Sequence, residues 1–302
     1  MLRKIFCLLA VIITVSSCGK KENEVSTSEN GSTESVEFSD SNSKVPFSWE
    51  QIKKMIDSDK AEGKRDFICT EDEWKASISN YNQKSIETLK TRKYATPELI
   101  EAMSLIPRPF YEYNYEKNER RISTENDFNT ILDIGWGATM SAPSIQSFMT
   151  ANLKPEKTDV ALEIGTGSGV QASILSRLVK KVYTIEIREK LAERVRNTIK
   201  AVGYNNIETK IGDGYYGWEE KGPFDIIIVT CQANHIPPDL VKQLKPNGRM
   251  VIPVGPAWSR NQQLLKVWKD PESGKVMSQR LLASTLFIPM LGANEGKKNN
   301  EK

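Results

Sequence analysis

The sequence predicts an α/β fold: a doubly wound, mostly parallel sheet of seven strands, preceded by an N-terminal helical extension. Three observations support this prediction. From Val160 onward, short apolar runs alternate with stretches whose apolar residues recur at helical spacing. Glycines at positions 165, 167 and 169 follow the first apolar run. A lone acid, Glu186, ends the second run about twenty residues later, as in folds that bind a nucleoside.

The N-terminal helical region is expected to span residues 46–130. Its helices are indicated by apolar residues at helical spacing, namely Trp49, Ile52, Met55 and Ile56, then Ile78, Ile86 and Leu89, then Leu99, Ile100 and Met103. Thr96 is expected to cap the third helix, with Pro97 in its first turn. A fourth helix, which belongs to the following domain, is expected to open with Ser141 as its N-cap.

The main domain is expected at residues 131–293. Its strands are predicted at residues 160–164, 182–187, 207–211, 224–230, 249–254, 264–268 and 281–288. In such a sheet a ligand binds beyond the carboxyl ends of the parallel strands. The glycine turn, Glu186, Asp213 and Thr230 all fall at those ends, so one cleft should collect them.

The glycine turn favours a cofactor that carries a nucleoside. Without a Cβ, the three glycines let the backbone bend tightly and approach a ligand closely. The third glycine comes one residue earlier than in a dinucleotide fingerprint, G-x-G-x-x-G. A cofactor without a pyrophosphate suits this tighter turn, and Glu186 would then hold its ribose. A purely structural glycine turn is the alternative.

The N-terminus resembles a bacterial lipoprotein signal. Residues 1–17 join a basic start to a short apolar run that ends in small residues before Cys18. By this resemblance Cys18 carries lipid, and the protein is anchored to a bacterial membrane at the cell envelope. Residues 18–45 are too polar to fold and are expected to form a disordered tether, with a second polar tail at residues 294–302. The alternatives are an uncleaved anchor, or a cytoplasmic protein whose signal is not used.

Composition excludes several function classes. A net charge of +3 does not suggest a nucleic-acid partner. The chain has one histidine, His235, which rules out a metal site with several His ligands and disfavours a Ser/His or Cys/His nucleophile. Beyond the signal, Cys69 and Cys231 fit no metal-site spacing. They are interpreted as two small buried residues, with a disulfide as the alternative.

Several motifs together resemble the protein-L-isoaspartate O-methyltransferase family. The resemblance covers about residues 83–291 and is specific as a set, although each motif alone is modest. The segments that carry it are Ile106-Pro-Arg-Pro-Phe110, Ile134-Gly-Trp-Gly-Ala-Thr-Met-Ser141, Leu162-Glu-Ile-Gly-Thr-Gly-Ser-Gly169, Gly212-Asp-Gly214, Ile236-Pro-Pro238, Leu244-Lys-Pro-Asn-Gly248 and Phe287-Ile-Pro289.

The resemblance implies a Rossmann-like methyltransferase that repairs damaged proteins. Such enzymes transfer a methyl group from S-adenosylmethionine to the α-carboxylate of L-isoaspartyl residues, without a metal. Thr139 and Ser141 match the family's substrate-binding hydroxyl residues and are the catalytic candidates. The residues expected to bind the cofactor are Glu163, Gly165, Thr166, Gly167, Ser168, Gly169, Glu186, Asp213, Gly214 and Thr230. A monomer is expected.

Several of these residues have an alternative interpretation of their expected role. Asp213 is expected to contact adenine, or else to be a plain turn residue, and Glu163 to orient the loop. Trp136 is expected to close over the substrate or to pack in the core. Residues 231–235 replace the small residues that the family usually has after its fourth strand, and His235 there is expected to face solvent.

Two rival functions differ in class. One is methyl transfer to a small molecule. The other is an inactive envelope lipoprotein that binds ligands or partners, because S-adenosylmethionine is made inside cells whereas a lipoprotein domain faces away from that supply.

Overall fold

The structure is a computed structural model that describes residues 49–50, 53, 70–106, 108–114, 116–117, 119–120, 128–202 and 204–295. The expected signal, Cys18, the tether, Cys69 and most of both the first helix and the polar tail lie outside the described residues. Within the described residues, no helix combines the length and the apolar character needed to cross a membrane.

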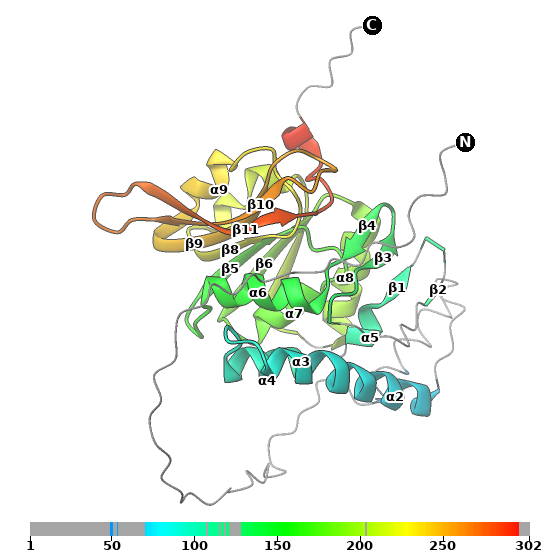
Figure 1. Ribbon diagram of the computed structural model, residues 1–302. Coiled ribbons are helices and arrows are strands. Elements are labelled where there is room, and N and C mark those ends of the chain that lie inside the picture. Colours follow the sequence, from blue (N-terminus) through cyan, green and yellow to red (C-terminus); the bar gives the residue numbers. More distant parts are fainter. Residues whose placement is uncertain are drawn as a thin grey trace, which may run out of the picture.

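A seven-stranded sheet forms the centre of the molecule (Figure 1). Its spatial order is β11-β10-β9-β8-β5-β6-β7. The strands are β5 (Val160–Ile164), β6 (Lys181–Glu186), β7 (Ile207–Ile211), β8 (Phe224–Val229), β9 (Leu244–Val254), β10 (Gln262–Lys269) and β11 (Val276–Thr285). Strands β5 to β9 pair in parallel, whereas β10 and β11 add an antiparallel hairpin at one edge. The predicted doubly wound, mostly parallel sheet is confirmed.

Three strand boundaries differ from the prediction by three residues or more. Strand β9 begins at Leu244, before the expected turn at Pro246-Asn-Gly248, and a register shift against β8 accommodates that turn within the strand. Strand β11 begins at Val276 rather than at residue 281 and ends at Thr285 rather than at residue 288. The next residues leave the strand because the Phe287 N–H donates to Gln262 Oε1 at 2.6 Å and the Ile288 carbonyl accepts the Gln232 N–H at 2.8 Å.

Helices cover both faces of the sheet, and the N-terminal helices form a further layer beyond α6 and α7 (Figure 1). The α-helices are α2 (Glu71–Tyr81), α3 (Glu87–Lys90), α4 (Pro97–Ser104), α5 (Arg108–Tyr111), α6 (Pro143–Leu153), α7 (Val170–Ser176), α8 (Glu189–Val202) and α9 (Pro238–Lys242). A π-helical turn, η1 (Asn82–Ile86), joins α2 to α3, and short 3₁₀ turns are η2 (Gly214–Tyr216), η3 (Glu219–Lys221) and η4 (Gly292–Glu295). Thr96 caps α4 as predicted, accepting the Leu99 N–H at 3.3 Å.

The prediction that Ser141 caps the fourth helix is wrong. Helix α6 begins at Pro143, and its N-cap is Ala142, which makes no side-chain cap bond. Proline sets the first helical position because its fixed φ suits the first turn. Ser141 therefore lies one residue before the N-cap position, and its hydroxyl does not cap the helix.

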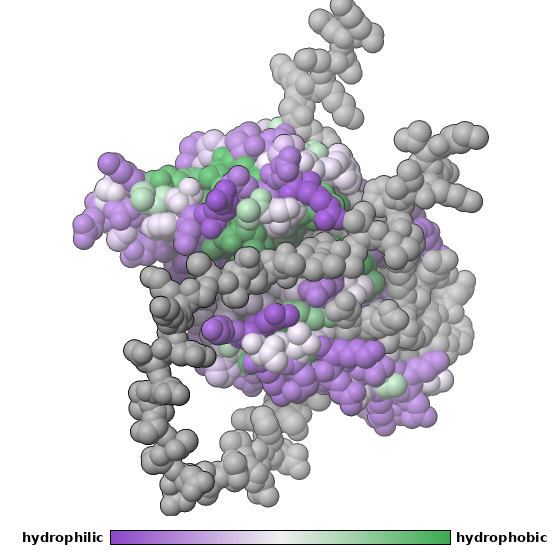
Figure 2. Space-filling model, viewed as in Figure 1, coloured by the Kyte–Doolittle hydropathy of each residue, from purple (hydrophilic) through white to green (hydrophobic). Residues whose placement is uncertain are grey.

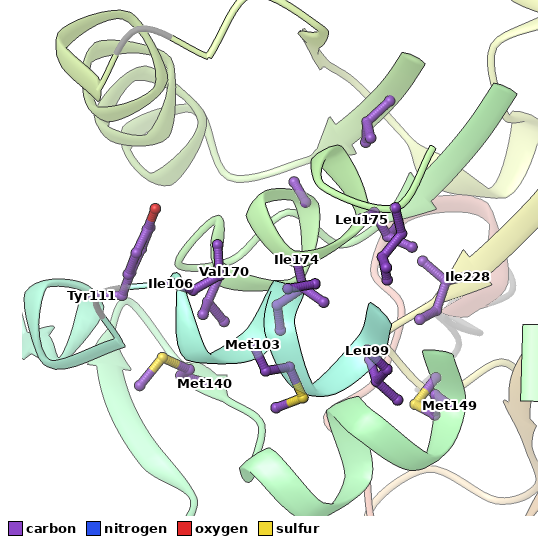
Figure 3. Close-up of a cluster of buried hydrophobic side chains, with 14 of the residues drawn as sticks. Leu99, Met103, Ile106, Tyr111, Met140, Met149, Val170, Ile174, Leu175 and Ile228 are labelled. Atoms are coloured by element: carbon purple, nitrogen blue, oxygen red, sulfur yellow. The ribbon is translucent and has the colours of Figure 1, made fainter. Parts of the chain in front are cut away.

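The sheet separates two apolar cores. Along β8, Ile226 and Ile228 face one core while Ile227 and Val229 face the other, as the two-residue period of a strand requires. The larger core also receives the N-terminal helices. Figure 3 shows part of it, with Leu99, Met103 and Ile106 from the N-terminal region beside residues of α6 and α7.

Two small hairpins were not predicted. Strands β1 (Tyr113–Asn114) and β2 (Glu119–Arg120) form one, and β3 (Leu132–Gly135) and β4 (Ala138–Met140) form the other. Trp136 and Gly137 turn the second hairpin with φ of 50° and 70°, which is typical of a two-residue hairpin loop. This hairpin brings Thr139 to the mouth of the cavity described next.

Candidate active site

A cavity lies at the carboxyl ends of β5, β6 and β8, beside the point where the strand order reverses, which is where a ligand binds in an open α/β sheet. It opens to solvent, and the hollow, counted with the solvent-filled space at its opening, contains about 780 Å³ of empty space. Its walls are the turn after β5, the ends of β6 and β8, the β3–β4 hairpin and the chain after β11. All the predicted cofactor residues line it except Gly169 and Asp213.

The three glycines of the turn after β5 share a left-handed backbone conformation but differ in the space available for a Cβ. All three have positive φ, 92° at Gly165, 54° at Gly167 and 88° at Gly169. A Cβ on Gly165 would lie 2.6 Å from Thr230 Oγ1, and one on Gly169 would lie 2.8 Å from Val195 Cγ1. At Gly167 the nearest atom would be 3.7 Å away. Of the three, only the middle glycine has room for a Cβ at ordinary contact distance, and as a cavity-lining glycine it allows a ligand to approach the backbone closely.

Glu186 joins the end of β6 to the glycine turn. It is 4% exposed and lines the cavity. Its Oε2 accepts the Gly167 N–H at 2.9 Å and its Oε1 accepts the Arg188 N–H at 3.0 Å. Each carboxylate oxygen can accept more than one hydrogen bond, so both remain able to accept ribose hydroxyls.

Glu163 is fully buried at the base of the cavity. Its Oε2 accepts a hydrogen bond from Thr184 Oγ1 at 2.6 Å, and that hydroxyl lies 2.6 Å from Thr166 Oγ1. Among the described residues, Glu163 Oε1 has no hydrogen-bond partner. Burial, with a smaller contribution from the charge of Glu186, raises the pKa of Glu163 to about 8. With this pKa Glu163 is mostly protonated at neutral pH, so its buried oxygen without a partner can donate a hydrogen bond to a ligand in the cavity or accept one from it.

Thr230 holds the glycine turn after β5 through hydrogen bonds to its backbone. Its Oγ1 lies 2.9 Å from the Ile164 carbonyl and 2.6 Å from the Gly165 carbonyl, to which it donates. The residue lines the cavity, but its hydroxyl proton is directed to the backbone. Thr230 therefore positions the glycine turn.

Asp213 lies beside the cavity without lining it, whereas Gly214 lines it. Its Oδ1 accepts the Tyr215 N–H at 2.9 Å, and its Oδ2 accepts the Ala293 N–H at 2.7 Å. The carboxylate thus caps η2 and fastens the C-terminal turn η4. The adenine contact stays a prediction, while the turn role is what the structure shows.

Thr139 and Ser141 lie on and just after β4 and line the same cavity. Thr139 is exposed and Ser141 is half-buried. Both also line a second, adjoining groove with about 1,280 Å³ of empty space, whose other wall is the end of β11 and the chain after it. The predicted substrate residues therefore lie at the junction of the two hollows.

Sequence reasoning assigned no role to Arg108, which the structure places behind Ser141. Arg108 is 2% exposed and pairs with Glu112, itself 3% exposed, at 3.4 Å. Its Nη2 donates to the Ser141 carbonyl at 3.0 Å and its Nη1 donates to Gln146 Oε1 at 2.8 Å. The signal available in the sequence was an arginine between two prolines, but its partners are far away along the chain.

Three other residues that the sequence analysis named have no assigned part in the reaction. Trp136 lies at the β3–β4 turn, half-buried against the larger core, and is absent from the cavity lining. His235 is exposed, as predicted, with Nε2 2.8 Å from the Tyr215 hydroxyl. Cys231 is a free, buried thiol in the cavity wall, and burial raises its pKa well above the usual range. Within the part of the chain that the structure describes, no group of acidic, His or Cys side chains is arranged to hold a metal ion.

The residues present fit S-adenosylmethionine. The backbone of Gly167 at the cavity wall offers a close surface, and the paired oxygens of Glu186 offer an acceptor for ribose hydroxyls. Glu163 Oε1, which has no partner among the described residues, offers a hydrogen-bonding group to the polar end of the ligand. These three features lie on adjacent strand ends, as a single bound nucleoside would require.

Comparison with known proteins agrees with this geometry. A family model described as protein-L-isoaspartate(D-aspartate) O-methyltransferase matches residues 80–295. Protein-L-isoaspartate O-methyltransferase 1 of Nitrosospira multiformis is 48% identical over 166 residues, which are 55% of this chain and 69% of that protein. Protein-L-isoaspartate O-methyltransferase 2 of Syntrophobacter fumaroxidans is 45% identical over 198 residues, which are 66% of this chain and 76% of that protein.

Solved structures show the same fold. A protein-L-isoaspartate O-methyltransferase superposes with a TM-score of 0.61 and 26% identity, over 69% of this chain and 65% of that one. A Plasmodium falciparum structure described as a complex with S-adenosyl-L-homocysteine gives a TM-score of 0.53 at 20% identity, over 71% of this chain and 98% of that one. The family match spans the helical region from residue 80 onward, the glycine turn and the groove, and the chain belongs to the protein-L-isoaspartate(D-aspartate) O-methyltransferase family.

Proposed function

We propose that this protein transfers a methyl group from S-adenosylmethionine to the α-carboxylate of L-isoaspartyl residues in damaged proteins. One observation carries the proposal: the cofactor cavity and the adjoining groove share Thr139, Ser141, Thr230 and Ile288. A polypeptide segment in the groove would therefore present a carboxylate to the cofactor at the two hydroxyl residues. The methyl ester that results collapses to a succinimide, from which some normal aspartate forms.

The residues at the junction suit a reaction that needs no general base. The acceptor is a carboxylate with a reference pKa of about 3.5, so it is ionised at neutral pH. S-adenosylmethionine, when bound, supplies a methyl group on a positively charged sulfur. Thr139 and Ser141 donate hydrogen bonds that hold the carboxylate in line, and the walls of the groove exclude water from the two opposite charges. Alignment of this kind can lower a barrier by several kcal/mol.

The test offers the protein labelled S-adenosylmethionine and two peptides that differ only in carrying aspartate or isoaspartate. Base-labile label on the isoaspartyl peptide alone supports the proposal, whereas equal labelling of both, or of neither, refutes it. Thr139→Val and Ser141→Ala should each lower kcat/KM for the isoaspartyl peptide. Thr158→Val, which removes the same hydroxyl from an exposed position outside both hollows, is the matched control.

We also propose that the domain works at a bacterial envelope membrane as a lipid-anchored monomer. The lipoprotein-type sequence before Cys18 supports the anchor, and about 25 tether residues have a root-mean-square reach of roughly 25–30 Å. Radioactive palmitate incorporated by the unchanged protein but not by Cys18→Ser would support the anchor, and light scattering would test the monomer.

A further inference from the structure

The groove beside the active site is lined mainly by apolar and hydroxyl side chains, with one charged exception. Leu282, Leu286, Ile131 and Ile145 line it, and Arg260 is the single charged residue among the described residues of its lining. Over β10 and β11 the molecular surface gathers apolar residues, while the tip of the hairpin beyond them is hydrophilic (Figure 2). A lone cation beside an apolar wall attracts an anionic group from a segment lying there.

Arg260 is held in place through its backbone. It lies in the connection between β9 and β10, and its carbonyl accepts a hydrogen bond from Ser284 Oγ at 2.8 Å. The next residue, Asn261, forms a bridge with Thr285 at the end of β11. The side chain itself is exposed, and within the described residues no carboxylate forms an ion pair with it. The fold thus fixes the position of the Arg260 backbone, and the guanidinium has no ion-pair partner among the described residues.

We propose that Arg260 makes this groove select isoaspartyl substrates that carry an acidic side chain next to the damaged residue. The inference rests on the proposed function, because it assigns a preference to the segment that flanks the methylated carboxylate. The reacting carboxylate is held at Thr139 and Ser141, at the cavity end of the groove. Arg260 lines the same groove, so a glutamate or aspartate on the same extended segment is its natural partner.

The experiment measures KM for isoaspartyl peptides that carry Glu, Gln or Lys at each flanking position in turn. For the unchanged protein, KM at one or more positions should be roughly two- to five-fold lower with Glu than with Gln, as expected for an exposed ion pair. In Arg260→Gln the Glu-to-Gln ratio should approach one, and in Arg260→Glu the Lys peptide should become the better substrate. The preference should fade in 1 M NaCl, where the Debye length is about 3 Å.

Arg280→Gln provides the matched control, because it removes the same charge from an exposed position of β11 outside the groove lining. If it shifts the KM ratio as much as Arg260→Gln does, the preference reflects net charge and the inference is wrong. An equal loss for all peptides in Arg260→Gln would also overturn it, because Arg260 would then act on the reacting carboxylate. Methylation of isoaspartyl peptides without any flanking preference refutes this inference alone, whereas no methylation refutes the proposed function.

Discussion

Arg108 Nη2 donates to the Ser141 carbonyl at 3.0 Å, across 33 positions of sequence. The same guanidinium binds Gln146 on α6 and pairs with Glu112 in the interior. Ser141 is thus held on both sides, by β4 before it and by a buried cation behind it. Its hydroxyl does not cap α6, and the residue lines the active-site cavity.

Replacing Arg108 should lower the free energy of unfolding. Arg108→Ala leaves Glu112 buried without its cation, and removing one partner of a buried ion pair typically costs about 3–5 kcal/mol. We expect that loss in the free energy of unfolding, measured by urea denaturation. The double variant Arg108→Leu/Glu112→Leu removes both charges and should be the more stable of the two. A single variant that is as stable as the double one would contradict this account.

The glycine turn permits a matched pair of substitutions. Gly165→Ala combines a positive φ with a Cβ 2.6 Å from Thr230 Oγ1, whereas Gly274→Ala meets positive φ alone, with nothing within 4 Å. Left-handed backbone costs an alanine roughly 1–2 kcal/mol, so Gly274→Ala should lose about that much stability. Gly165→Ala should lose more, and should also weaken S-adenosylmethionine binding in calorimetry. Equal losses of stability for the two variants would mean that the contact with Thr230 has no energetic weight.

Glu186 should contribute to cofactor affinity. Glu186→Ala removes the acceptor of the Gly167 N–H and the expected acceptor of the ribose hydroxyls, and hydrogen bonds to charged groups contribute about 1.5–3 kcal/mol. We expect S-adenosylmethionine to bind roughly ten- to a hundred-fold more weakly in calorimetric titration. Glu189→Ala, an exposed acid at the start of α8, should bind the cofactor normally. Unchanged affinity in Glu186→Ala would remove this residue from the site.

Glu163 should make stability depend on pH. Its pKa is raised from 4.5 to about 8 in the folded protein, so between those values the folded state binds the proton that the unfolded state has lost. The stability associated with Glu163 is therefore complete below about pH 4.5, falls as pH rises and levels off above pH 8.

Glu163→Gln removes this titration. Its stability relative to the unchanged protein should rise from pH 5 to pH 8.5 by an amount on the order of a few kcal/mol. The comparison is made by thermal or urea unfolding at both pH values, without cofactor. A difference between the two proteins that stays constant with pH would show that Glu163 titrates normally.

Much of the site could be predicted because its signals are local. An apolar run followed by alternate glycines predicts a strand, a tight turn and a helix, and β5 and α7 follow in that order. Glu186 was placed at a strand end by the same short-range pattern, and β6 ends at that residue. Parallel strands then bring these ends to one edge, so the cavity itself was foreseen.

Other features depend on partners that are distant in the sequence. The β3–β4 hairpin, the early start of β9 and the end of β11 each depend on pairing with a segment elsewhere in the chain. Serine is a common helix cap, but α6 begins at Pro143 and Ser141 therefore does not cap it. Asp213 was expected to contact adenine, yet its two carboxylate oxygens accept hydrogen bonds from the backbone of η2 and of the C-terminal turn η4.

The sequence by itself determined the alternation of strands and helices, the glycine turn and the family to which these motifs point, because backbone conformation and apolar periodicity are set by neighbouring residues. Only the tertiary structure decided that Arg108 lies behind Ser141, that Glu163 is buried with one oxygen unpartnered among the described residues, and that Arg260 lines the groove with Thr139. The physical reason is that burial, charge pairing and the shape of a cavity are properties of segments that meet in space, and no local pattern specifies which segments meet.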